Sequence, residues 1–408
     1  MLAIYNLGIF IYSILIYLAS FFSAKAKLWR TGRKHQTFIR SPGGIWFHFA
    51  SLGEFEQGRP VLEHFREFYP ERKICITFFS PSGYEIRKNT PLADVVYYLP
   101  LDTASNARNF ISTIQPGMAI FTKYEYWYHF FNETRRSGVP LYVISAIFRP
   151  EQIFFKWYGG LHRRILSFVT YFFVQDERSK QLLSGINIDN AVVSGDTRFD
   201  RVWANALSPR QIPAVADFAG NSKILVAGST WPPDEDLIAT LAAQYPTWKF
   251  IIAPHEINES KINRLLGLLP QNAAIRFSNI TSAQSIHDYH ILIIDNIGML
   301  SALYQYGDIA YIGGGFGAGI HNTLEAAAFG LPVIFGPNYA KFREARDLID
   351  LKAGFSIQDR SGLNEVIDRL VNDPQFYDDA CKQAFNYVKQ HTGATGIIAT
   401  RILQKDDL

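Results

Sequence analysis

The 408-residue sequence predicts an α/β protein built from two doubly wound, Rossmann-like domains. Short apolar runs of strand length alternate with amphipathic stretches of helical spacing, which is the pattern of parallel sheets covered by helices. The alternation is interrupted at residues 205–222, where prolines and small polar residues follow no sustained period. With 48% hydrophobic residues the chain can bury large cores, and its length favours two domains over one.

Each half of the chain carries its own series of apolar runs that predict strands. In the first half these runs cover residues 44–50, 74–79, 95–99, 118–121, 141–145, 171–175 and 191–194. In the second half they cover 223–227, 248–253, 291–294, 308–312 and 332–335. The resulting division is a membrane anchor over 1–24, a first domain over 25–204, a linker over 205–222, a second domain over 223–385 and a C-terminal helix over 386–408.

Composition and absent motifs narrow the function. A formal net charge of +3 is nearly neutral, so no nucleic-acid partner is implied. Only Cys75 and Cys381 occur, which excludes a disulfide framework or a cysteine zinc site and suits a reducing compartment. The sequence has no Walker-type loop, His-Glu-x-x-His motif, Gly-x-Ser-x-Gly elbow or strand-end Asp-x-Asp pair. We therefore expect no metal and no cofactor, with leaving-group charge stabilised by backbone dipoles and basic side chains.

The N-terminus reads as a membrane segment. Residues 2–22 carry no charge and are long enough, as a helix, to cross a hydrocarbon layer of ~30 Å. Basic residues follow at once: Lys25, Lys27, Arg30, Arg33 and Lys34. This flank predicts that the rest of the chain lies in the cytoplasm. A cleaved signal peptide is the alternative, but it would want basic residues before the apolar run. We expect a retained anchor or a helix embedded in the cytoplasmic leaflet.

A glycine-rich stretch, residues 313–337, begins directly after the apolar run 308–312 and contains the apolar run 332–335. Its glycines remove side chains from a strand-to-helix turn, so that backbone N–H groups can approach an anion. These glycines are Gly313, Gly314, Gly315, Gly317 and Gly319, and His321 follows them. In the alternative interpretation Asn322 caps the helix, Glu325 completes a capping box and the glycines merely turn the chain.

The first predicted strand runs into Ser51-Leu52-Gly53-Glu54 at the start of a helical pattern. Ser51 and Glu54 have capping-box spacing, which would make their role structural. Glu54 also stands at the C-terminal end of a strand, where open parallel sheets bind their ligands. The residues alone leave both interpretations open.

Both stretches resemble one family. GGGFGAGIHNTLEAAAFGLPVIFGP is similar to the donor-site segment of the 3-deoxy-D-manno-octulosonic acid (Kdo) transferases, glycosyltransferases that build the inner core of lipopolysaccharide. The shared pattern is a Gly-rich turn, His-Asn-x-Leu-Glu and Ala-Ala-Phe-Gly-x-Pro-Val. Ser51-Leu52-Gly53-Glu54 resembles the family's Ser-x-Gly-Glu, whose Glu is regarded as the catalytic base. The resemblance implies a GT-B fold, in which two Rossmann-like domains face a cleft, and assigns the base to Glu54.

Three weaker matches follow in the first half. Glu125 lies in Tyr124-Glu125-Tyr126-Trp127, which resembles the family's Glu-x-Trp segment and places Glu125 near the reaction centre. Arg149 resembles the arginine of an Asn-Ala-Arg type sequence. Arg198 replaces the lysine of Gly-Asn-x-Lys-Phe-Asp and is a candidate cation near a phosphate. Without the resemblance, Glu125 reads as a solvated helix-start acid and Arg198 as an exposed structural arginine.

Two matches fall in the second half. Gly228, Ser229 and Thr230 correspond to the family's Ala-Ser-Thr and look like phosphate or sugar-carboxylate contacts, although a simple N-cap explains Ser or Thr equally well. His255 occupies the place of the histidine in Pro-Arg-His-Pro-Glu, but here no arginine precedes it. The nucleotide-site role of His255 therefore competes with a structural one.

The resemblance implies an inverting glycosyltransferase that moves Kdo from CMP-Kdo to a hydroxyl of a lipid A precursor. The expected location is the cytoplasmic face of the bacterial inner membrane. In this interpretation Arg59, on the helix that carries Glu54, receives a phosphate of the lipid acceptor; the alternative is a solvated basic face.

Two rivals remain: another GT-B lipid glycosyltransferase, and a protein of a different class, either an epimerase or an inactive binding module. A GT-B lipid glycosyltransferase with a UDP-N-acetylhexosamine donor would share the turn and the anchor but should lack Ser-x-Gly-Glu. A GT-B-like UDP-sugar epimerase needs no membrane anchor, so residues 2–22 argue against it. A catalytically inactive binding module should not have kept both Glu54 and Glu325.

Overall fold

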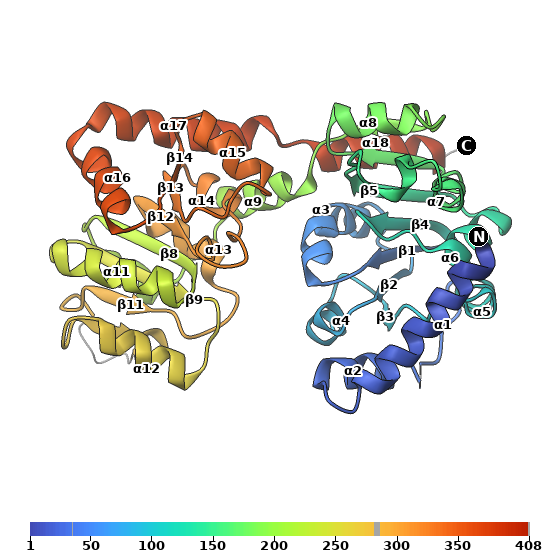
Figure 1. Cartoon of the computed structure of the whole chain (residues 1–408), viewed down its shortest axis with the longest axis horizontal. Coiled ribbons are helices and arrows are strands. Elements are labelled where there is room, and N and C mark those ends of the chain that lie inside the picture. The colour runs from blue at the N-terminus through green and yellow to red at the C-terminus, as the bar shows by residue number, and fades with distance from the viewer. Residues whose placement is uncertain (35, 281–285, 407–408) are drawn as a thin grey trace. The chain divides into compact units, whose positions relative to one another are not determined.

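The computed structural model describes residues 1–408 except 35, 281–285 and 407–408 (Figure 1). The chain forms two compact units. The first unit contains Met1–Arg201 together with the residues from Thr392 onward, and the second contains Val202–His391. Each unit holds a seven-stranded sheet whose paired strands are parallel. The predicted class, two Rossmann-like α/β domains, is confirmed.

The elements of the first unit alternate as expected for a doubly wound fold. The strands are β1 (Gly44–Phe49), β2 (Ile74–Phe78), β3 (Val95–Tyr98), β4 (Pro116–Thr122), β5 (Leu141–Ala146), β6 (Tyr171–Val174) and β7 (Ala191–Val193). The helices are α1 (Leu2–Ala19), α2 (Ala24–Gly32), α3 (Leu52–Phe68), α4 (Pro81–Arg87), α5 (Ala104–Ile114), α6 (Tyr128–Arg136), η1 (Ile153–Phe155), α7 (Gly160–Leu166), α8 (Glu177–Ser184) and α18 (Ala394–Asp406), and α9 (Thr197–Leu207) runs on into the second unit.

The second unit repeats the pattern with shorter strands. These are β8 (Ile224–Thr230), β9 (Lys249–Pro254), β10 (Ala274–Arg276), β11 (Ile291–Ile293), β12 (Ile309–Ile312), β13 (Val333–Phe335) and β14 (Gly354–Ser356). Its helices are α10 (Pro213–Ala219), α11 (Pro232–Gln244), α12 (Glu259–Leu268), η2 (Phe277–Asn279), α13 (Leu300–Leu303), η3 (Tyr304–Tyr306), α14 (Leu324–Ala327), α15 (Arg343–Asp350), α16 (Arg360–Asn372) and α17 (Pro374–Gln390).

The strand order decides where each unit can bind a ligand. The first sheet runs β3-β2-β1-β4-β5-β6-β7, so the direction of the crossovers reverses between β1 and β4. The second sheet runs β10-β11-β9-β8-β12-β13-β14 and reverses between β8 and β12. Ligands of open α/β sheets bind at the carboxyl ends of the strands at such a switch point. The segments after β1, β4, β8 and β12 are therefore the candidate sites.

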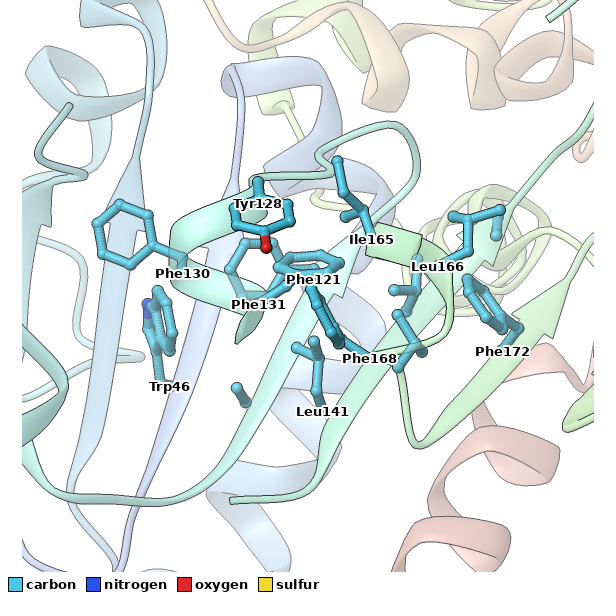
Figure 2. Packing of buried hydrophobic residues seen from close by; sticks show 14 of the residues in the cluster. Trp46, Phe121, Tyr128, Phe130, Phe131, Leu141, Ile165, Leu166, Phe168 and Phe172 are labelled. Atoms are coloured by element: carbon cyan, nitrogen blue, oxygen red, sulfur yellow. The ribbon is translucent and has the colours of Figure 1, made fainter. Parts of the chain in front are cut away.

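An aromatic core holds β1 and β4 in place in the first unit (Figure 2). The ring of Trp46 on β1 lies 4.9 Å from that of Phe121 on β4 and 5.0 Å from that of Phe110, measured between centroids. Phe121 in turn packs edge-on against Phe131 of α6 at 4.9 Å. Aromatic pairs of this geometry contribute about 0.5–1.5 kcal/mol beyond their buried area. Because these rings interlock, the loops that follow the two strands start from fixed positions.

Some elements differ from the sequence expectation. Residues 205–222, predicted to be a linker, contain the end of α9 and the seven-residue helix α10, whose Val215 and Phe218 are buried. A helix of two turns is too short to show a sustained apolar period. The edge strands β10 and β14 were not predicted, because each has only three residues. The C-terminal stretch 386–408 comprises the end of α17 and a separate helix, α18.

The carboxylate of Asp200, on α9, binds donors at the start of α18. One oxygen accepts from the Gly393 N–H at 2.6 Å, and the other accepts from the N–H and the hydroxyl of Thr395, both at 2.6 Å. The first N–H groups of a helix have no partner within the helix, so this carboxylate satisfies donors that would otherwise need water. Asp200 is the last residue of the Gly-Asp-Thr-Arg-Phe-Asp motif, and the structure gives it this structural role.

We expect Asp200→Ala to lower the free energy of unfolding by about 1–2 kcal/mol, the usual cost of losing a helix cap. Asp200→Asn should cost less, because its amide oxygen still accepts one of these bonds. Urea unfolding followed by far-UV circular dichroism measures both. Equal stability of wild type and Asp200→Ala would contradict the role given to this carboxylate.

Candidate functional site

Glu54 lies in the first turn of α3, directly after β1. Ser51 precedes the helix but makes no side-chain hydrogen bond to the helix backbone. Its hydroxyl instead donates to the Glu54 carboxylate. The capping-box interpretation is therefore not realised, and Ser51 orients the carboxylate. Gly53 is exposed, and a Cβ added there would meet only the Ser51 hydroxyl at 3.7 Å, so the surface beside Glu54 is open within this unit.

Glu125 follows β4, and its carboxylate lies close to two ring nitrogens. Its Oε2 accepts from the indole N–H of Trp127 at 2.9 Å and lies 3.4 Å from Nε2 of His48. The side chain is 17% exposed, and α6 begins only at Tyr128. Glu125 is thus a fixed, half-buried carboxylate at the switch point, and the interpretation as a solvated helix-start acid is wrong.

A chain of hydrogen bonds behind Glu125 was missed by the sequence analysis. The indole N–H of Trp46 donates to the Thr77 hydroxyl at 2.8 Å, and that hydroxyl lies 2.8 Å from Nδ1 of His48. The same hydroxyl also donates to the Phe47 carbonyl at 3.4 Å. Trp46, Thr77 and His48 thus form one buried network that ends at Nε2 of His48, 3.4 Å from the Glu125 carboxylate. A histidine in the otherwise apolar, fully buried strand β1 was the available signal.

Arg198 is paired within its own motif. Its guanidinium binds the Asp196 carboxylate through Nε at 2.8 Å and through a terminal nitrogen at 2.8 Å. Gln57 of α3 donates to the same carboxylate at 2.9 Å. Burial by itself raises the pKa of Asp196, but the charge and hydrogen bonds of Arg198 and the charge of Lys123 lower it more, so its pKa lies below the usual value. Arg198 is a cation in a fixed position, not a solvated arginine.

Tyr124 shows which charges share this edge of the sheet. Burial raises the pKa of its phenol; the nearby cations Arg149 and Arg198 lower it, and the carboxylates Asp196 and Glu54 raise it. One phenol therefore lies within electrostatic reach of residues that follow β1, β5 and β7. Arg149 itself is exposed. Glu54, Arg149 and Arg198 therefore each lie near Tyr124.

Two strand ends in this region have an unusual backbone. Lys123, directly after β4, has φ = 67°, and Ser145, near the end of β5, has φ = 50°. Residues other than glycine seldom adopt this left-handed region, and such positions cluster at functional sites. The Ser145 hydroxyl lies 2.7 Å from that of Thr197 at the start of α9. Both deviations occur beside the groups around Tyr124.

Arg59 lies one turn further along α3, within a network of ion pairs. Its guanidinium binds Glu63 at 2.6 Å and Glu56 at 3.5 Å, and Arg87 and Arg201 share these two carboxylates. The network contains three guanidinium groups and two carboxylates. An acceptor phosphate would therefore have to exchange with a carboxylate to bind Arg59.

In the second unit a cavity of about 340 Å³ opens beside the glycine-rich turn, near the lower end of the range for small-molecule sites. Its lining is Trp231, Pro232, Pro233, Asp234, Gly314, Phe316, Gly317, Ala318, Gly319 and His321. Asp234 closes its base: the carboxylate accepts from the N–H groups of Gly314 and Trp231, each at 2.9 Å, and from the Tyr311 hydroxyl at 2.8 Å. This one carboxylate joins the turn to the start of α11.

Gly313 and Gly315 in the turn, and Gly228 on β8, lie against neighbouring backbone or side chains, which was not expected. A Cβ on Gly313 would lie 2.3 Å from the Ser229 carbonyl oxygen, one on Gly315 would lie 2.6 Å from the backbone of Gly336, and one on Gly228 would meet the Tyr304 hydroxyl at 2.2 Å. These glycines allow close packing of neighbouring strand ends.

The N–H groups of the turn are largely used inside the protein. That of Gly314 donates to Asp234, and those of Gly317 and Gly319 donate to the Gly314 carbonyl at 3.0 and 3.3 Å. The N–H of Gly313 donates to the Gly228 carbonyl at 2.9 Å. These four N–H groups therefore have partners inside the protein, and anion binding by the rest of the turn stays a prediction. Gly317 and Gly319 contribute walls of the cavity.

Asn322 and Glu325 lie at the short helix α14. The amide oxygen of Asn322 accepts from the Leu324 N–H at 3.1 Å, and its NH₂ donates to the Glu325 carboxylate at 3.0 Å. Asn322 therefore satisfies the first N–H of the helix from one position before the N-cap residue Thr323, and Glu325 bonds its side chain instead of forming the expected capping box. The bond between the two side chains also fixes the carboxylate of Glu325.

Three rings stack beside the cavity. His255 lies 4.8 Å from Trp231 and 4.4 Å from His321, measured between centroids. The Trp231 indole N–H donates to Nε2 of His321 at 3.2 Å, so this nitrogen must be unprotonated. Burial and the neighbouring His255 lower the pKa of His321 to about 4, and burial and Lys261 lower the pKa of His255. Trp231 was missed; an aromatic residue between Thr230 and Pro232 was the available signal.

Ser229 and Thr230 form the last residues of β8. Trp231, not either of them, occupies the position before α11, and Asp234 provides its cap. The simple N-cap interpretation is therefore wrong for both. Ser229 has φ = 54°, a third left-handed position at a strand end beside a candidate site.

Two surveys of the described residues complete the site. In the part of the chain that the structure describes, no group of three or more His, Cys, Asp or Glu side chains is arranged to hold a metal ion. Among the same residues α1, with a mean hydropathy of 2.0, is the helix long and apolar enough to cross a membrane.

Comparison with known proteins points to one family. A family model described as 3-deoxy-D-manno-octulosonic-acid transferase (kdotransferase) matches residues 23–201. The 3-deoxy-D-manno-octulosonic acid transferase of Chlamydia trachomatis is 28% identical over 348 residues, which cover 82% of this chain and 80% of that protein. A protein of the same name from Haemophilus influenzae is 24% identical over 368 residues, covering 86% and 85%.

Among solved structures, a UDP-GlcNAc 2-epimerase from Neisseria meningitidis aligns with a TM-score of 0.64 at 17% identity and covers 88% of this chain and 100% of that one. At this identity the likeness concerns the fold alone, two Rossmann-like domains of GT-B type. The family model and the curated relatives go further, since they match along the sequence: residues 23–201 fit the Kdo transferase model, and more than 80% of the chain is similar to curated Kdo transferases, a family of glycosyltransferases.

Proposed function

We propose that the protein is an inverting glycosyltransferase that moves Kdo from CMP-Kdo to a hydroxyl of a lipid A precursor in lipopolysaccharide core biosynthesis. One observation carries the proposal. The Kdo transferase model matches residues 23–201, and this is the stretch whose fold gathers Glu54, Glu125, Arg149 and Arg198 at the carboxyl edge of one sheet. The motif residues are far apart in sequence, and their convergence favours a common reaction centre.

In the proposed mechanism Glu54 is the general base. A carboxylate at a strand end, beside open surface, can take the proton of an acceptor hydroxyl as that oxygen attacks the anomeric carbon. The Ser51 hydroxyl bonds the carboxylate and limits its rotation. Arg149 and Arg198 add positive charge near the attacking group, which suits a donor sugar that carries a carboxylate. Glu125, bonded by Trp127 and His48, is proposed to orient the acceptor.

The donor is proposed to bind in the second unit, at the end of β8 and along the turn after β12. The cavity of about 340 Å³ offers apolar and aromatic walls, and the indole of Trp231 is a surface on which a nucleobase can stack. Fixed groups nearby are Ser229, Asn322 and Glu325. Since the turn's N–H groups at Gly313, Gly314, Gly317 and Gly319 are engaged, the leaving phosphate must rely mainly on other donors.

Two rival functions are less well supported. The UDP-sugar epimerases share the fold at low identity, and the curated relatives named above are Kdo transferases. A UDP-N-acetylhexosamine donor remains the alternative for a lipid glycosyltransferase. We also propose that the enzyme works without a metal or cofactor at the cytoplasmic face of the inner membrane, with α1 as its membrane contact.

Purified protein should transfer Kdo to a tetraacylated lipid A precursor when CMP-Kdo is generated in the assay, and EDTA should not reduce the rate. Glu54→Gln should lower kcat by about 10²–10⁴-fold, the usual contribution of a general base. Glu365→Gln, an exposed substitution on α16, is the matched control. No product from the wild type, with CMP-Kdo shown to be present, would overturn the donor assignment, and UDP-sugars would be tested next.

The hydrogen-bond chain behind Glu125 predicts an effect of buried residues on activity. Thr77→Val removes the hydroxyl that bonds Nδ1 of His48 and should reduce kcat by about 10-fold, the cost of one misplaced hydrogen bond to a charged group. His48→Gln should retain more activity than His48→Leu, because its amide can still donate to Glu125. Only variants whose melting temperature matches that of the wild type are compared. Equal rates for His48→Gln and His48→Leu would exclude a role of His48 in positioning Glu125.

The lowered pKa of His321 predicts that the second unit becomes less stable in acid. Its pKa is lowered to about 4 in the fold, against about 6.5 in an unfolded chain. The unfolded state therefore binds protons first, and stability falls as the pH drops from about 6.5 toward 4. His321→Gln keeps an acceptor for Trp231 without titrating and should flatten this fall, leaving the part due to His255. Melting temperatures at several pH values test this, with His64→Gln as control; an unchanged slope in His321→Gln would refute it.

A further inference from the structure

The helix α1 carries a covered stripe along its whole length. The residues on this stripe are less exposed than their neighbours and recur at intervals of three and four, the spacing of one helix face. They are Leu2, Tyr5, Ile9, Tyr12, Ser13, Ile16 and Ala19. From the first to the last, the stripe spans about 26 Å at 1.5 Å per residue. The first unit thus contacts α1 over a distance comparable to a hydrocarbon core.

Polar contacts fasten the start of this stripe. The Tyr5 hydroxyl donates to the Asp102 carboxylate at 2.5 Å, and the same carboxylate accepts from the N–H groups of His129 and Phe130 at the start of α6. The side-chain oxygen of Asn6 lies 2.7 Å from Nε2 of His129. These bonds join α1 to the loop before α5 and to α6, beside which it lies in Figure 1. An apolar tether free of the protein would not need such partners.

Aromatic contacts fasten the middle of the stripe and lead to the site. The Tyr12 ring lies 5.7 Å from that of Trp29 on α2 and 6.1 Å from that of Phe79, which follows β2. Phe79 stacks on Trp127 at 5.0 Å, and the Trp127 indole donates to Glu125 at 2.9 Å. Three successive rings therefore connect the inner face of α1 with a carboxylate of the candidate reaction centre.

The opposite face of α1 is apolar and open. Ile4, Leu7, Phe10, Ile11, Ile14, Leu15 and Leu18 are between 42% and 72% exposed. The exposed Lys25 and Lys27 follow on α2, so positive charge comes soon after this apolar helix in the chain. An apolar helix face with adjacent lysines fits the surface of a bilayer that contains anionic phospholipid.

We propose that α1 lies in the plane of the cytoplasmic leaflet as a fixed part of the first unit, and that it holds the Glu125 side of the site at the lipid surface. A helix that spans a bilayer has lipid or another membrane-embedded helix around it. Here the covered stripe touches α6 and the irregular segment after β2, whose polar backbone cannot enter hydrocarbon. Insertion by one face keeps these segments in water.

The consequence for the reaction rests on the proposed function. A lipid acceptor can keep its acyl chains in the leaflet beside α1 while its head group reaches Glu125, so α1 acts as a wall of the acceptor path as well as an attachment.

The position of the N-terminus tests the orientation of the helix. In the full chain with Cys75→Ala and Cys381→Ala, a hydrophilic leader Gly-Ser-Ser-Cys is added before the apolar run. An impermeant maleimide should label it in inverted membrane vesicles and not in intact spheroplasts, as it should label the control Lys25→Cys. Labelling of the leader in spheroplasts, with Lys25→Cys protected, would show a spanning helix and overturn the proposal. This readout does not depend on the substrate.

Two matched tyrosines test the link to the site. Tyr12 lies on the covered stripe, whereas Tyr17 is 50% exposed on the same helix. In vesicles, Tyr12→Ala should lower Kdo transfer at least 10-fold while the protein stays membrane-bound, and Tyr12→Phe should restore it. Tyr17→Ala should leave transfer within about 2-fold of wild type. Equal transfer rates for Tyr12→Ala and Tyr17→Ala would show that α1 only attaches the protein to the membrane and would contradict its link to the site. If the wild type transfers no Kdo, the proposed function fails while the labelling result stands.

Discussion

The parallel pairing of β1 with β4 is the constraint on which the first unit depends. Because the crossovers leave in opposite directions on either side of this pair, the segments after the two strands lie at a switch point, the place where open α/β sheets bind ligands. Glu54 follows one strand and Glu125 the other. The interlocked rings of Trp46, Phe121 and Phe131 keep the two strands from shifting. Thr77 on the neighbouring strand then extends this rigidity to Glu125 through a buried histidine.

In the second unit a carboxylate, and not an aromatic core, fixes the segments at the switch point. Asp234 accepts three hydrogen bonds and joins β12, the turn after it and the start of α11. Burial raises the pKa of this carboxyl, while the three donors oppose the rise. Because the turn's N–H groups are used in building the cavity, recognition there depends on side chains and on the aromatic stack of Trp231, His255 and His321. This is a different chemistry from a glycine loop that wraps a phosphate with its backbone.

Specific contacts also fix α1, the proposed membrane contact, relative to the candidate site. A tyrosine and an asparagine in an otherwise apolar helix would be costly in lipid without hydrogen-bond partners. In this structure Tyr5 donates to Asp102, and the side-chain oxygen of the exposed Asn6 lies 2.7 Å from Nε2 of His129. The polar residues thus decide which face of α1 is left for lipid, and the aromatic residues behind Tyr12 carry that orientation to Glu125.

Local patterns in the sequence determined much of this protein. Apolar periods were enough to predict two doubly wound domains, the apolar helix and most strands, because the period of a strand or helix is encoded over a few neighbouring residues. Short motifs at strand ends singled out Glu54, Glu125, Arg149 and Arg198, but only through their resemblance to Kdo transferase motifs. Only the tertiary structure decided how these groups are paired: that Ser51 bonds a carboxylate instead of a backbone, that Asp196 holds Arg198, and that the N–H groups of the glycine turn are engaged. Ser51 and Glu54, like Asp196 and Arg198, are close in the chain, but which of several possible bonds such neighbours make depends on the surrounding fold. Gln57 reaches Asp196, and Asp234 reaches the Gly314 N–H, from far away in the chain, and no local pattern contains that information.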